Sequence, residues 1–394
     1  KVLRQQLNDF KSSDKFILSY ATMYSQKSYY LASVASQLYL HPEGGFSFTG
    51  FSAQMMYFKG LMDKLGVTAQ IFYAGKFKSA TEPFRRKNMT PENREQVSKY
   101  MSGMYDLYLE DLAASRDISA AELFRIANNA LIRNSEDAVS YKMVDATKYK
   151  DEIIDELRDK LGTDEDDEME MVSLSKYYSV QKSELNKSSD NEKIAVVYAE
   201  GSIVDGKGES GSIGGDKYAA IIRKIRKDDK VKAIVMRVNS GGGSALASDI
   251  IWRELEKAKE QGIKIVTSMG DVAASGGYYI ASNSEEIFAE NNTITGSIGV
   301  FGIIPNIGPA LKKNFGITFD RAQTNHHSVL SLNKALTDEE KHLIQLGVDD
   351  IYNDFTQKVA DGRDGLEQAD VDSIGQGRVW SGTDALRIGL VDEL

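Results

Sequence analysis

The sequence of 394 residues predicts an α/β protein in which parallel sheets are flanked by helices and the fold unit occurs twice in tandem. Apolar runs such as Ala233–Val238 and Ile263–Val266 are typical of strands that are buried on both faces. Between them, Ala247–Ala258 carries apolar residues at helical spacing along one face. Strands that alternate with amphipathic helices indicate a parallel sheet covered by helices.

The tandem arrangement is predicted from an internal repeat. The pentapeptide YYLAS at 29–33 returns as YYIAS at 278–282, which is 249 residues later. Near the end of each copy, Met143-Val144-Asp145 matches Leu390-Val391-Asp392, which is 247 residues later. Similarity at a nearly constant spacing indicates one fold unit used twice.

From these matches we expect an N-terminal repeat at 1–147, a linker at 148–191 and a C-terminal repeat at 192–394. The C-terminal repeat opens with an apolar strand segment from Lys193, for which the N-terminal repeat has no counterpart. We therefore expect further chain before Lys1 in the natural protein, and any membrane anchor would lie there. The linker contains the acidic run DEDDE and a tail rich in Ser, Lys and Asn, which indicates a solvated segment. Within it we expect one helix, at Glu152–Leu161.

Composition excludes several classes of protein. The net charge is −10 without a basic stripe, so nucleic acid is not an expected partner. The absence of cysteine excludes disulfides, thiol catalysis and cysteine-bound zinc. The four histidines form no HExxH motif and no serine lies in GxSxG, so a histidine-dependent hydrolase is not favoured. We expect neither a cofactor nor a metal ion, and no apolar run reaches the roughly 18 residues of a membrane span.

Ser275 is the candidate nucleophile. It lies where an apolar strand turns into the helix that begins near Tyr278, and alanine and glycine surround it. Small neighbours are needed because a substrate backbone must approach the serine Oγ. The N–H of Gly276 would point out of a helix N-terminus, where negative charge is stabilised. The alternative is a tight turn of small residues without chemistry.

A second turn, residues 239–244, carries three consecutive glycines after the strand Ala233–Val238. It lacks the lysine of a phosphate-binding loop, so an oxyanion hole is the better interpretation. A glycine N–H of this turn and that of Gly276 would converge on a carbonyl oxygen. The alternative is a flexible connection between strand and helix.

Lys78 is the candidate base. It lies in GKFKSATEPF, an apolar, small-residue segment in which burial would lower the pKa of a lysine enough for it to accept a proton. Lys76 lies two residues earlier in the same segment. The alternative is that both lysines are at the surface. In the repeat, Ser275 corresponds to Gln26, and Lys78 corresponds to about Asn325. Neither copy therefore contains both the candidate nucleophile and the candidate base. This division suggests a single type of site to which both copies contribute.

Four motifs resemble those of the bacterial signal peptide peptidase A family in its long, tandem-repeat form. They are VNSGGGSALAS, SMGDVAASGGYYIA, TGSIGVFG and GKFKSATEPF, and they occur in the expected places along nearly all of the chain except the linker. The resemblance implies a ClpP/crotonase-like fold and a Ser–Lys dyad serine protease. It implies Ser275 as nucleophile, Lys78 as general base and Ser297 as the serine that orients the lysine, with Gly242 and Gly276 forming the oxyanion hole.

The resemblance also implies partners and a location. It implies a homotetramer whose dyads form between neighbouring subunits, anchored in the bacterial cytoplasmic membrane, facing outward and degrading remnant signal peptides and other apolar peptides. One departure is Gly241, where the family usually has a proline with its fixed φ.

Three questions stay open at the level of sequence. A crotonase-like acyl-CoA enzyme would need no lysine partner for Ser275. A catalytically silent scaffold on membranes would tolerate Ser275→Ala without biochemical change. A dyad within one chain is the alternative to a dyad shared between subunits, because a linker of about 40 residues spans either arrangement.

Overall fold

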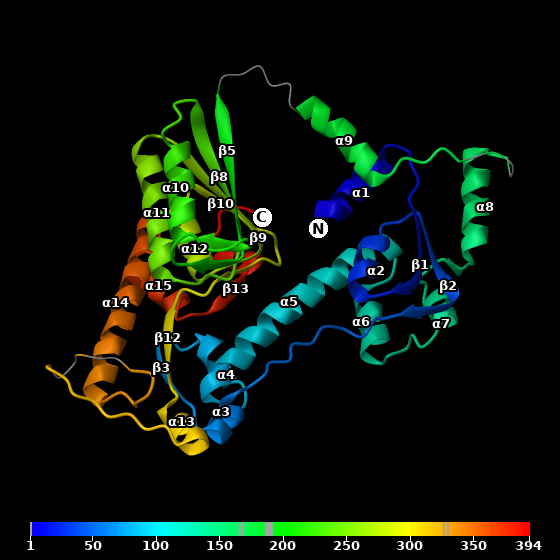
Figure 1. The fold of residues 1–394 in the computed structure, drawn as a ribbon. Coiled ribbons are helices and arrows are strands. Elements are labelled where there is room, and N and C mark those ends of the chain that lie inside the picture. The colour runs from blue at the N-terminus through cyan, green and yellow to red at the C-terminus, as the bar shows by residue number, and fades with distance from the viewer. Residues whose placement is uncertain (1, 165–166, 168, 186–191, 326–327, 329–330) are drawn as a thin grey trace. The chain divides into compact units, whose positions relative to one another are not determined.

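The computed structural model describes residues 2–164, 167, 169–185, 192–325, 328 and 331–394 (Figure 1). It divides into two compact units. Residues 1–52 and 101–189 form the N-terminal unit, and residues 53–100 and 190–394 form the C-terminal unit. Within the described residues, no helix combines the length and the apolar character that crossing a membrane requires.

The largest sheet lies in the C-terminal unit and confirms the predicted α/β class. Its strand order is β13-β11-β9-β8-β5, with β10 also beside β9, and all neighbours are parallel except β11 and β13. The predicted strand at 233–238 lies within the central strand β8, and the predicted strand at 263–266 matches the start of β9, which begins one residue later, at Lys264. The bounds are β5 Lys193–Glu200, β8 Val231–Ser240, β9 Lys264–Ala274, β10 Glu286–Phe288, β11 Ile294–Gly296 and β13 Val379–Ser381.

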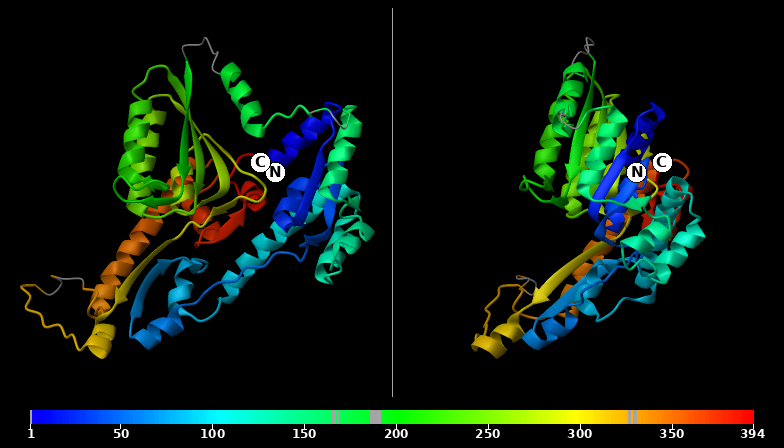
Figure 2. Two further views of the ribbon diagram at one scale, coloured as in Figure 1. Left: turned by 45° about the vertical axis from the view of Figure 1, so that its right-hand side comes forward. Right: turned by 90° about the vertical axis from the view of Figure 1, so that its right-hand side faces the viewer.

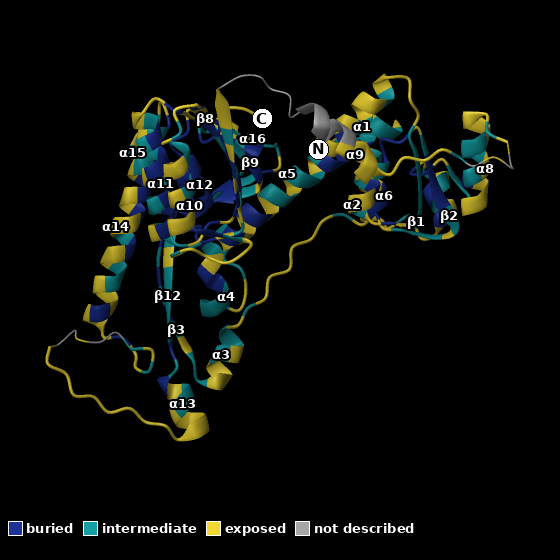
Figure 3. Ribbon diagram, turned by 45° about the horizontal axis from the view of Figure 1, so that its top comes forward, coloured by how far each residue is buried: buried dark blue, intermediate teal, exposed yellow. Residues whose placement is uncertain are grey.

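Helices α10 and α11 lie on one face of this sheet (Figures 1 and 2). The predicted helix at 247–258 lies within α11, where Ile251 and Leu255 are fully buried in the same apolar core as Ile234 and Met236 of β8. Figure 3 shows the same burial as dark blue strands and helix faces. The helices and remaining short strands are α10 Gly215–Ile225, α11 Ala245–Glu260, α12 Gly276–Ala281, α14 Asp338–Gly362, α15 Gln368–Ile374, α16 Gly382–Arg387, β6 Ser202–Val204 and β7 Ser212–Gly214.

A separate two-stranded antiparallel sheet belongs to the same unit. It pairs β3 (Thr68–Ala74) with β12 (Val300–Asn306) along seven residues, from Val300 opposite Ala74 to Asn306 opposite Thr68. Strand β3 runs directly into the segment that carries Lys78. The helices of this part of the chain are α3 Lys59–Leu65, η1 Ser79–Thr81, α4 Glu82–Arg85, α13 Gly308–Phe315 and α5 Pro91–Arg116, of which the residues from 101 onward belong to the N-terminal unit.

This ladder changes the expected domain boundary. We predicted that Lys78 belongs to an N-terminal repeat at 1–147, but residues 53–100 are part of the C-terminal unit. The reason is that the backbone hydrogen bonds of β3 are made with β12, more than 200 residues later in the chain. Proximity in sequence does not reveal such a pairing.

The N-terminal unit contains a smaller parallel sheet in the order β1-β2-β4. Its core includes the fully buried Leu38, Leu40, Leu112 and Leu123. The bounds are β1 Leu18–Tyr24, β2 Gln37–Phe46, β4 Ala146–Thr147, α1 Val2–Ser12, α2 Gln26–Ala32, α6 Ala120–Asn128, α7 Ser135–Ser140, α8 Lys150–Leu161 and α9 Leu174–Leu185.

The predicted linker at 148–191 is more structured than its charge suggested. The expected helix at 152–161 is present within α8, and the described linker residues up to 185 belong to the N-terminal unit. Ile153 of α8 is buried, and Glu156 accepts hydrogen bonds from Tyr39 and Lys148. An apolar side chain and an ion pair therefore hold a segment that we expected to be solvated. Part of the acidic run lies outside the described residues.

The two units contain matching hydrogen bonds. The Tyr29 hydroxyl donates to the carbonyl oxygen of Met143 at 2.8 Å, and the Tyr278 hydroxyl donates to that of Leu390 at 2.9 Å. Both tyrosines lie in the YY(L/I)AS segments that define the repeat. A second pair of hydrogen bonds also matches between the units. The N–H of Leu38 donates to the Asp145 carboxylate at 2.7 Å, and the N–H of Ile287 donates to the Asp392 carboxylate at 2.8 Å.

Candidate active site

Ser275 occupies the predicted turn between strand and helix. It is the N-cap of α12, directly after β9, with φ 55° and ψ −122°. A positive φ is strained for a residue with a Cβ and persists only where surrounding contacts hold it. Here the Ser275 N–H donates to Gly296 O at 2.8 Å, and its carbonyl accepts from the N–H of Tyr279 at 2.9 Å. The turn is therefore fixed from both sides.

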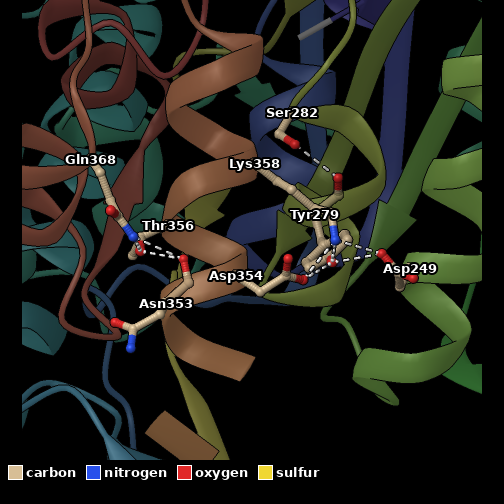
Figure 4. Close-up of polar contacts among 8 residues, drawn as sticks. All are labelled: Asp249, Tyr279, Ser282, Asn353, Asp354, Thr356, Lys358 and Gln368. Atoms are coloured by element: carbon tan, nitrogen blue, oxygen red, sulfur yellow. Dashed lines mark hydrogen bonds and ion pairs between the residues drawn. The ribbon is translucent and has the colours of Figure 1, made fainter. Parts of the chain in front are cut away.

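A polar cluster anchors the helix that follows Ser275 (Figure 4). The Tyr279 hydroxyl lies 3.0 Å from carboxylate oxygens of both Asp249 and Asp354. Lys358 Nζ donates to Asp249 at 2.7 Å, to Asp354 at 2.6 Å and to the Tyr279 hydroxyl at 3.0 Å. Because burial and the two carboxylates disfavour the phenolate, the pKa of Tyr279 is raised. The cluster ties α12 to both α11 and α14.

Lys78 and Ser275 meet within one chain. Lys78 Nζ lies 3.1 Å from Ser275 Oγ, 3.0 Å from Ser297 Oγ and 2.9 Å from the Ser297 carbonyl oxygen. The lysine is only 4% exposed, whereas Lys76 is exposed. We expected from the family that the pair forms between subunits, but the β3–β12 ladder brings both residues together in a single C-terminal unit.

Burial sets the protonation of Lys78. It lowers the pKa of the amine to about 7, because the charged form is taken out of water. A neutral amine has two N–H donors and one lone pair. The two Ser297 oxygens match the two donors, which leaves the lone pair for the hydroxyl proton of Ser275. Ser297 itself has φ 51° and its N–H donates to Arg378 O at 2.7 Å.

The predicted oxyanion glycines adjoin the serine. A Cβ added to Gly242 would lie 2.5 Å from Gly276 N and 2.9 Å from Ser275 Cβ, so only glycine fits there. The Gly276 N–H, at the first position of α12, has no acceptor within its helix. The Gly242 N–H differs from our expectation, because it donates to Ser240 Oγ at 3.1 Å.

The glycine turn is held by β6. The Ile203 N–H donates to Gly242 O at 3.0 Å, and the Ser244 N–H donates to Ile203 O at 2.9 Å. A Cβ added to Gly241 would meet no atom within 4 Å. Packing around this position therefore does not depend on the proline that the family usually has there.

The counterpart of Ser275 in the N-terminal unit lacks a hydroxyl. Gln26 begins α2 just after its N-cap Ser25, and its side-chain oxygen accepts from the N–H groups of Gly50 and Thr49 at 2.8 and 3.1 Å. Asn325, the approximate counterpart of Lys78, is exposed. The described residues thus place one serine–lysine pair, Lys78 and Ser275, in the C-terminal unit, although the sequence repeat assigns the two residues to different copies.

Three residues near the pair were not predicted. Ser240 lies in a motif that we identified, but its hydroxyl carried no assigned role. The Phe301 ring is centred 6.0 Å from Lys78 Nζ and is 43% exposed, and Gln96 bonds to the loop around the lysine. Phe301 lies in the quoted motif TGSIGVFG but likewise carried no assigned role, and Gln96 has no local signal because its contacts are made across elements.

Comparison with known proteins shows the family of the chain. The chain is 38% identical over its whole length to "Protease 4" of Salmonella typhi and 35% identical over 98% of it to "Protease 4" of Haemophilus influenzae. It is 31% identical over 99% of its length to "Serine protease SPPA, chloroplastic" of Arabidopsis thaliana. The chain spans 64%, 64% and 58% of these relatives, respectively. A profile described as "Peptidase family S49" matches residues 9–164 and 257–394, and the chain therefore belongs to peptidase family S49.

Proposed function

We propose that this chain is the catalytic part of a serine endopeptidase that uses a Ser–Lys dyad. One observation carries the proposal: a buried lysine amine lies 3.1 Å from Ser275 Oγ while both of its other hydrogen bonds are to Ser297. A nucleophile is recognised by a base within hydrogen-bond reach and a third group that orients the base. Neither an acyl-CoA enzyme nor a silent scaffold would need this arrangement.

In the proposed reaction, neutral Lys78 takes the hydroxyl proton as Ser275 Oγ attacks the scissile carbonyl carbon. The ammonium then gives that proton to the leaving amine, and an acyl-enzyme remains on Ser275. Water attacks the ester with Lys78 again as base, which releases the acid and restores the serine.

The carbonyl oxygen becomes negative in the tetrahedral intermediate. We assign the Gly276 N–H as the first donor, because it points out of the N-terminus of α12 beside Ser275. Gly242 would be the second donor, and its N–H would then leave Ser240 Oγ for the developing oxyanion.

We further propose that the chain contains two tandem copies of a ClpP/crotonase-like unit. The matched tyrosine and carboxylate hydrogen bonds of the two units support this. The sheet neighbours agree as well: Met23 pairs with Gly45 in the first unit, and their counterparts 249 residues later, Val272 and Ile294, pair in the second.

Remnant signal peptides and other apolar peptides are the substrates that we propose. Two exposed apolar side chains support this class, namely Phe301 at 43% and Leu246, the second residue of α11 after the glycine turn, at 63%. From the family resemblance we place the reaction at the bacterial cytoplasmic membrane, on its outer side.

A homotetramer is the proposed assembly. Large apolar side chains are exposed on and beside α3 and α13, and burying such surface is the usual driving force for association. They are Leu61, Leu65, Phe315, Ile317 and Phe319. In this assembly each chain would carry its own dyad.

Labelling with a fluorophosphonate tests the dyad. The native chain should label, whereas Ser275→Ala should not label and should lose peptide hydrolysis by several orders of magnitude with its fold intact. Lys78→Ala should label far more slowly. Hydrolysis by Ser275→Ala within a few-fold of the native chain would refute the proposal.

A further inference from the structure

The loop that carries Lys78 is held by contacts that the proposed reaction does not itself use. Lys78 precedes the single turn η1, and its own N–H donates to Gly75 O at 3.1 Å. Such a short loop contributes little to its own stability. Yet the amine is buried beside Ser275, so something outside the loop must hold it there.

Gln96 of α5 contacts the loop on both sides of the lysine. Its Nε2 lies 3.1 Å from Phe77 O and 3.2 Å from Ser79 Oγ, the residues before and after Lys78. The side chain is only 5% exposed, and Asn93 Oδ1, at 3.1 Å from Nε2, helps to orient the amide. A buried amide with several partners is held in one orientation, because each lost bond would leave a polar group unsatisfied.

The other end of the same amide reaches the segment 376–379, near the C-terminus. Gln96 Oε1 accepts from the N–H of Val379 at 3.3 Å, while Gln376 O accepts from the N–H of Phe77 at 2.8 Å. Gly377 lies directly against the lysine, since a Cβ there would meet Lys78 Cβ at 2.6 Å.

Segment 376–379 also holds the Ser297 loop. Arg378 O accepts from the N–H of Ser297 at 2.7 Å, and the N–H of Gly377 donates to Ile298 O at 2.6 Å. The base and the serine that orients it are therefore fixed to one common segment, which lies far from both in sequence.

We infer that Gln96, together with the backbone of 376–379, is the positioning device that keeps Lys78 buried against Ser275. Gln96 does not touch the reacting atoms, so it is a positioning residue. This inference rests on the proposed dyad. Its consequence is electrostatic: a loosened loop would let water reach the amine, and hydration raises the pKa of a buried lysine toward its ordinary value.

The charged side chains on the neighbouring segments do not contact the Lys78 amine in the described structure. Lys76 is exposed, and Glu82 is bound by Asn93 and Thr90. The Arg378 guanidinium stacks 3.8 Å from the centre of the Phe77 ring and pairs with Glu95 at 3.1 Å. Burial is the one cause that lowers the pKa of Lys78. Entry of water to the amine is therefore the change that would raise this pKa.

Gln96→Met tests the inference, because methionine keeps the length of the side chain and removes both hydrogen-bonding groups. We would measure kcat/KM and the rate of fluorophosphonate labelling from pH 5.5 to 10. We expect the rising limb to move upward by about one pH unit, so that both rates fall about fivefold at pH 7 and recover to within about threefold of native by pH 10. KM should change little.

Gln345→Leu is the matched control. Gln345 Nε2 donates to Tyr73 O at 3.3 Å, so this variant also removes a glutamine contact to the backbone of β3, but not at the lysine loop. Its pH profile should match the native one. Ser79→Ala, a milder change that removes one acceptor of Gln96, should move the limb in the same direction by a smaller amount and serves if Gln96→Met does not fold.

The outcomes are distinct. An unchanged pH limb in Gln96→Met, or a loss by the same factor at every pH, would overturn the positioning role. Failure of the dyad itself would appear in two other variants, as a pH limb that survives Lys78→Ala or as labelling that survives Ser275→Ala. The inference and the proposed function therefore fail by different observations.

Discussion

At the scale of residues, the site depends on keeping a lysine neutral. Lys78 is buried, its pKa is lowered to about 7, and Ser297 accepts from its amine at two oxygens. The base is the deprotonated form, so activity should rise with pH through about 7 and stay high in mild alkali. Lys78→Arg should be inactive, because a guanidinium does not deprotonate at these pH values.

Lys78→Met should stabilise the fold in a manner that depends on pH. In the unfolded chain the pKa of lysine is about 10.4, so the folded state is penalised for burying the amine below that value. The penalty is full below about pH 7, falls as the pH rises and vanishes above the unfolded pKa. After allowing for the lost hydrogen bonds, we expect the free energy of unfolding to rise by roughly 3 kcal/mol at pH 7 and by much less at pH 10. Urea unfolding at both pH values measures this, and equal effects would contradict a buried neutral lysine.

Ser297→Ala should reduce kcat/KM by about tenfold to a hundredfold, less than loss of Ser275 or Lys78. The hydroxyl accepts one of the two amine hydrogens, while the carbonyl of the same residue still accepts the other. Steady-state kinetics beside Lys78→Ala provides the comparison. A loss as large as that of Lys78→Ala would assign Ser297 a direct part in bond-making.

At the scale of elements, helix α12 stabilises the strained turn at Ser275. Tyr279 is fully embedded in the cluster with Asp249, Asp354 and Lys358, and its backbone N–H bonds to Ser275 O. The helix is only six residues long, so tertiary contacts rather than helix propensity must hold it. The β3–β12 ladder likewise fixes the strand that leads into the Lys78 segment.

Tyr279→Phe should lower the free energy of unfolding by about 1–3 kcal/mol, because the hydroxyl bonds to charged groups that partly lose their partner. Lys358 still pairs with both carboxylates, which limits the loss. Thermal unfolding and kcat should be measured together. A variant with native stability would show that the cluster does not anchor α12.

At the scale of the whole molecule, the dyad within one chain makes a prediction about mixed oligomers. Ser275→Ala and Lys78→Ala chains, unfolded together and refolded, should stay inactive. Because each site is built from one chain, every site lacks either the serine or the lysine. The measurement is peptide hydrolysis, with mixed assembly confirmed by mass. Recovery of part of the activity would instead show a site shared between subunits, as the family resemblance had led us to expect.

The sequence by itself determined the local features of this protein. The apolar strand, the small-residue turn and the helix start around Ser275 are all encoded within about 15 residues, so the proposed nucleophile was predictable from local pattern. The repeat and the four motifs identified the lysine, Ser297 and the two glycines. The helix at 152–161 within the predicted linker was also expected from the sequence.

Only the tertiary structure decided which unit contains the lysine and what keeps it neutral. Strand β3 finds its hydrogen-bond partners in β12, and Gln96 meets Phe77, Ser79 and Val379 through contacts between elements. Whether a lysine is charged depends on its exclusion from water, and that exclusion exists only once such distant segments have packed together.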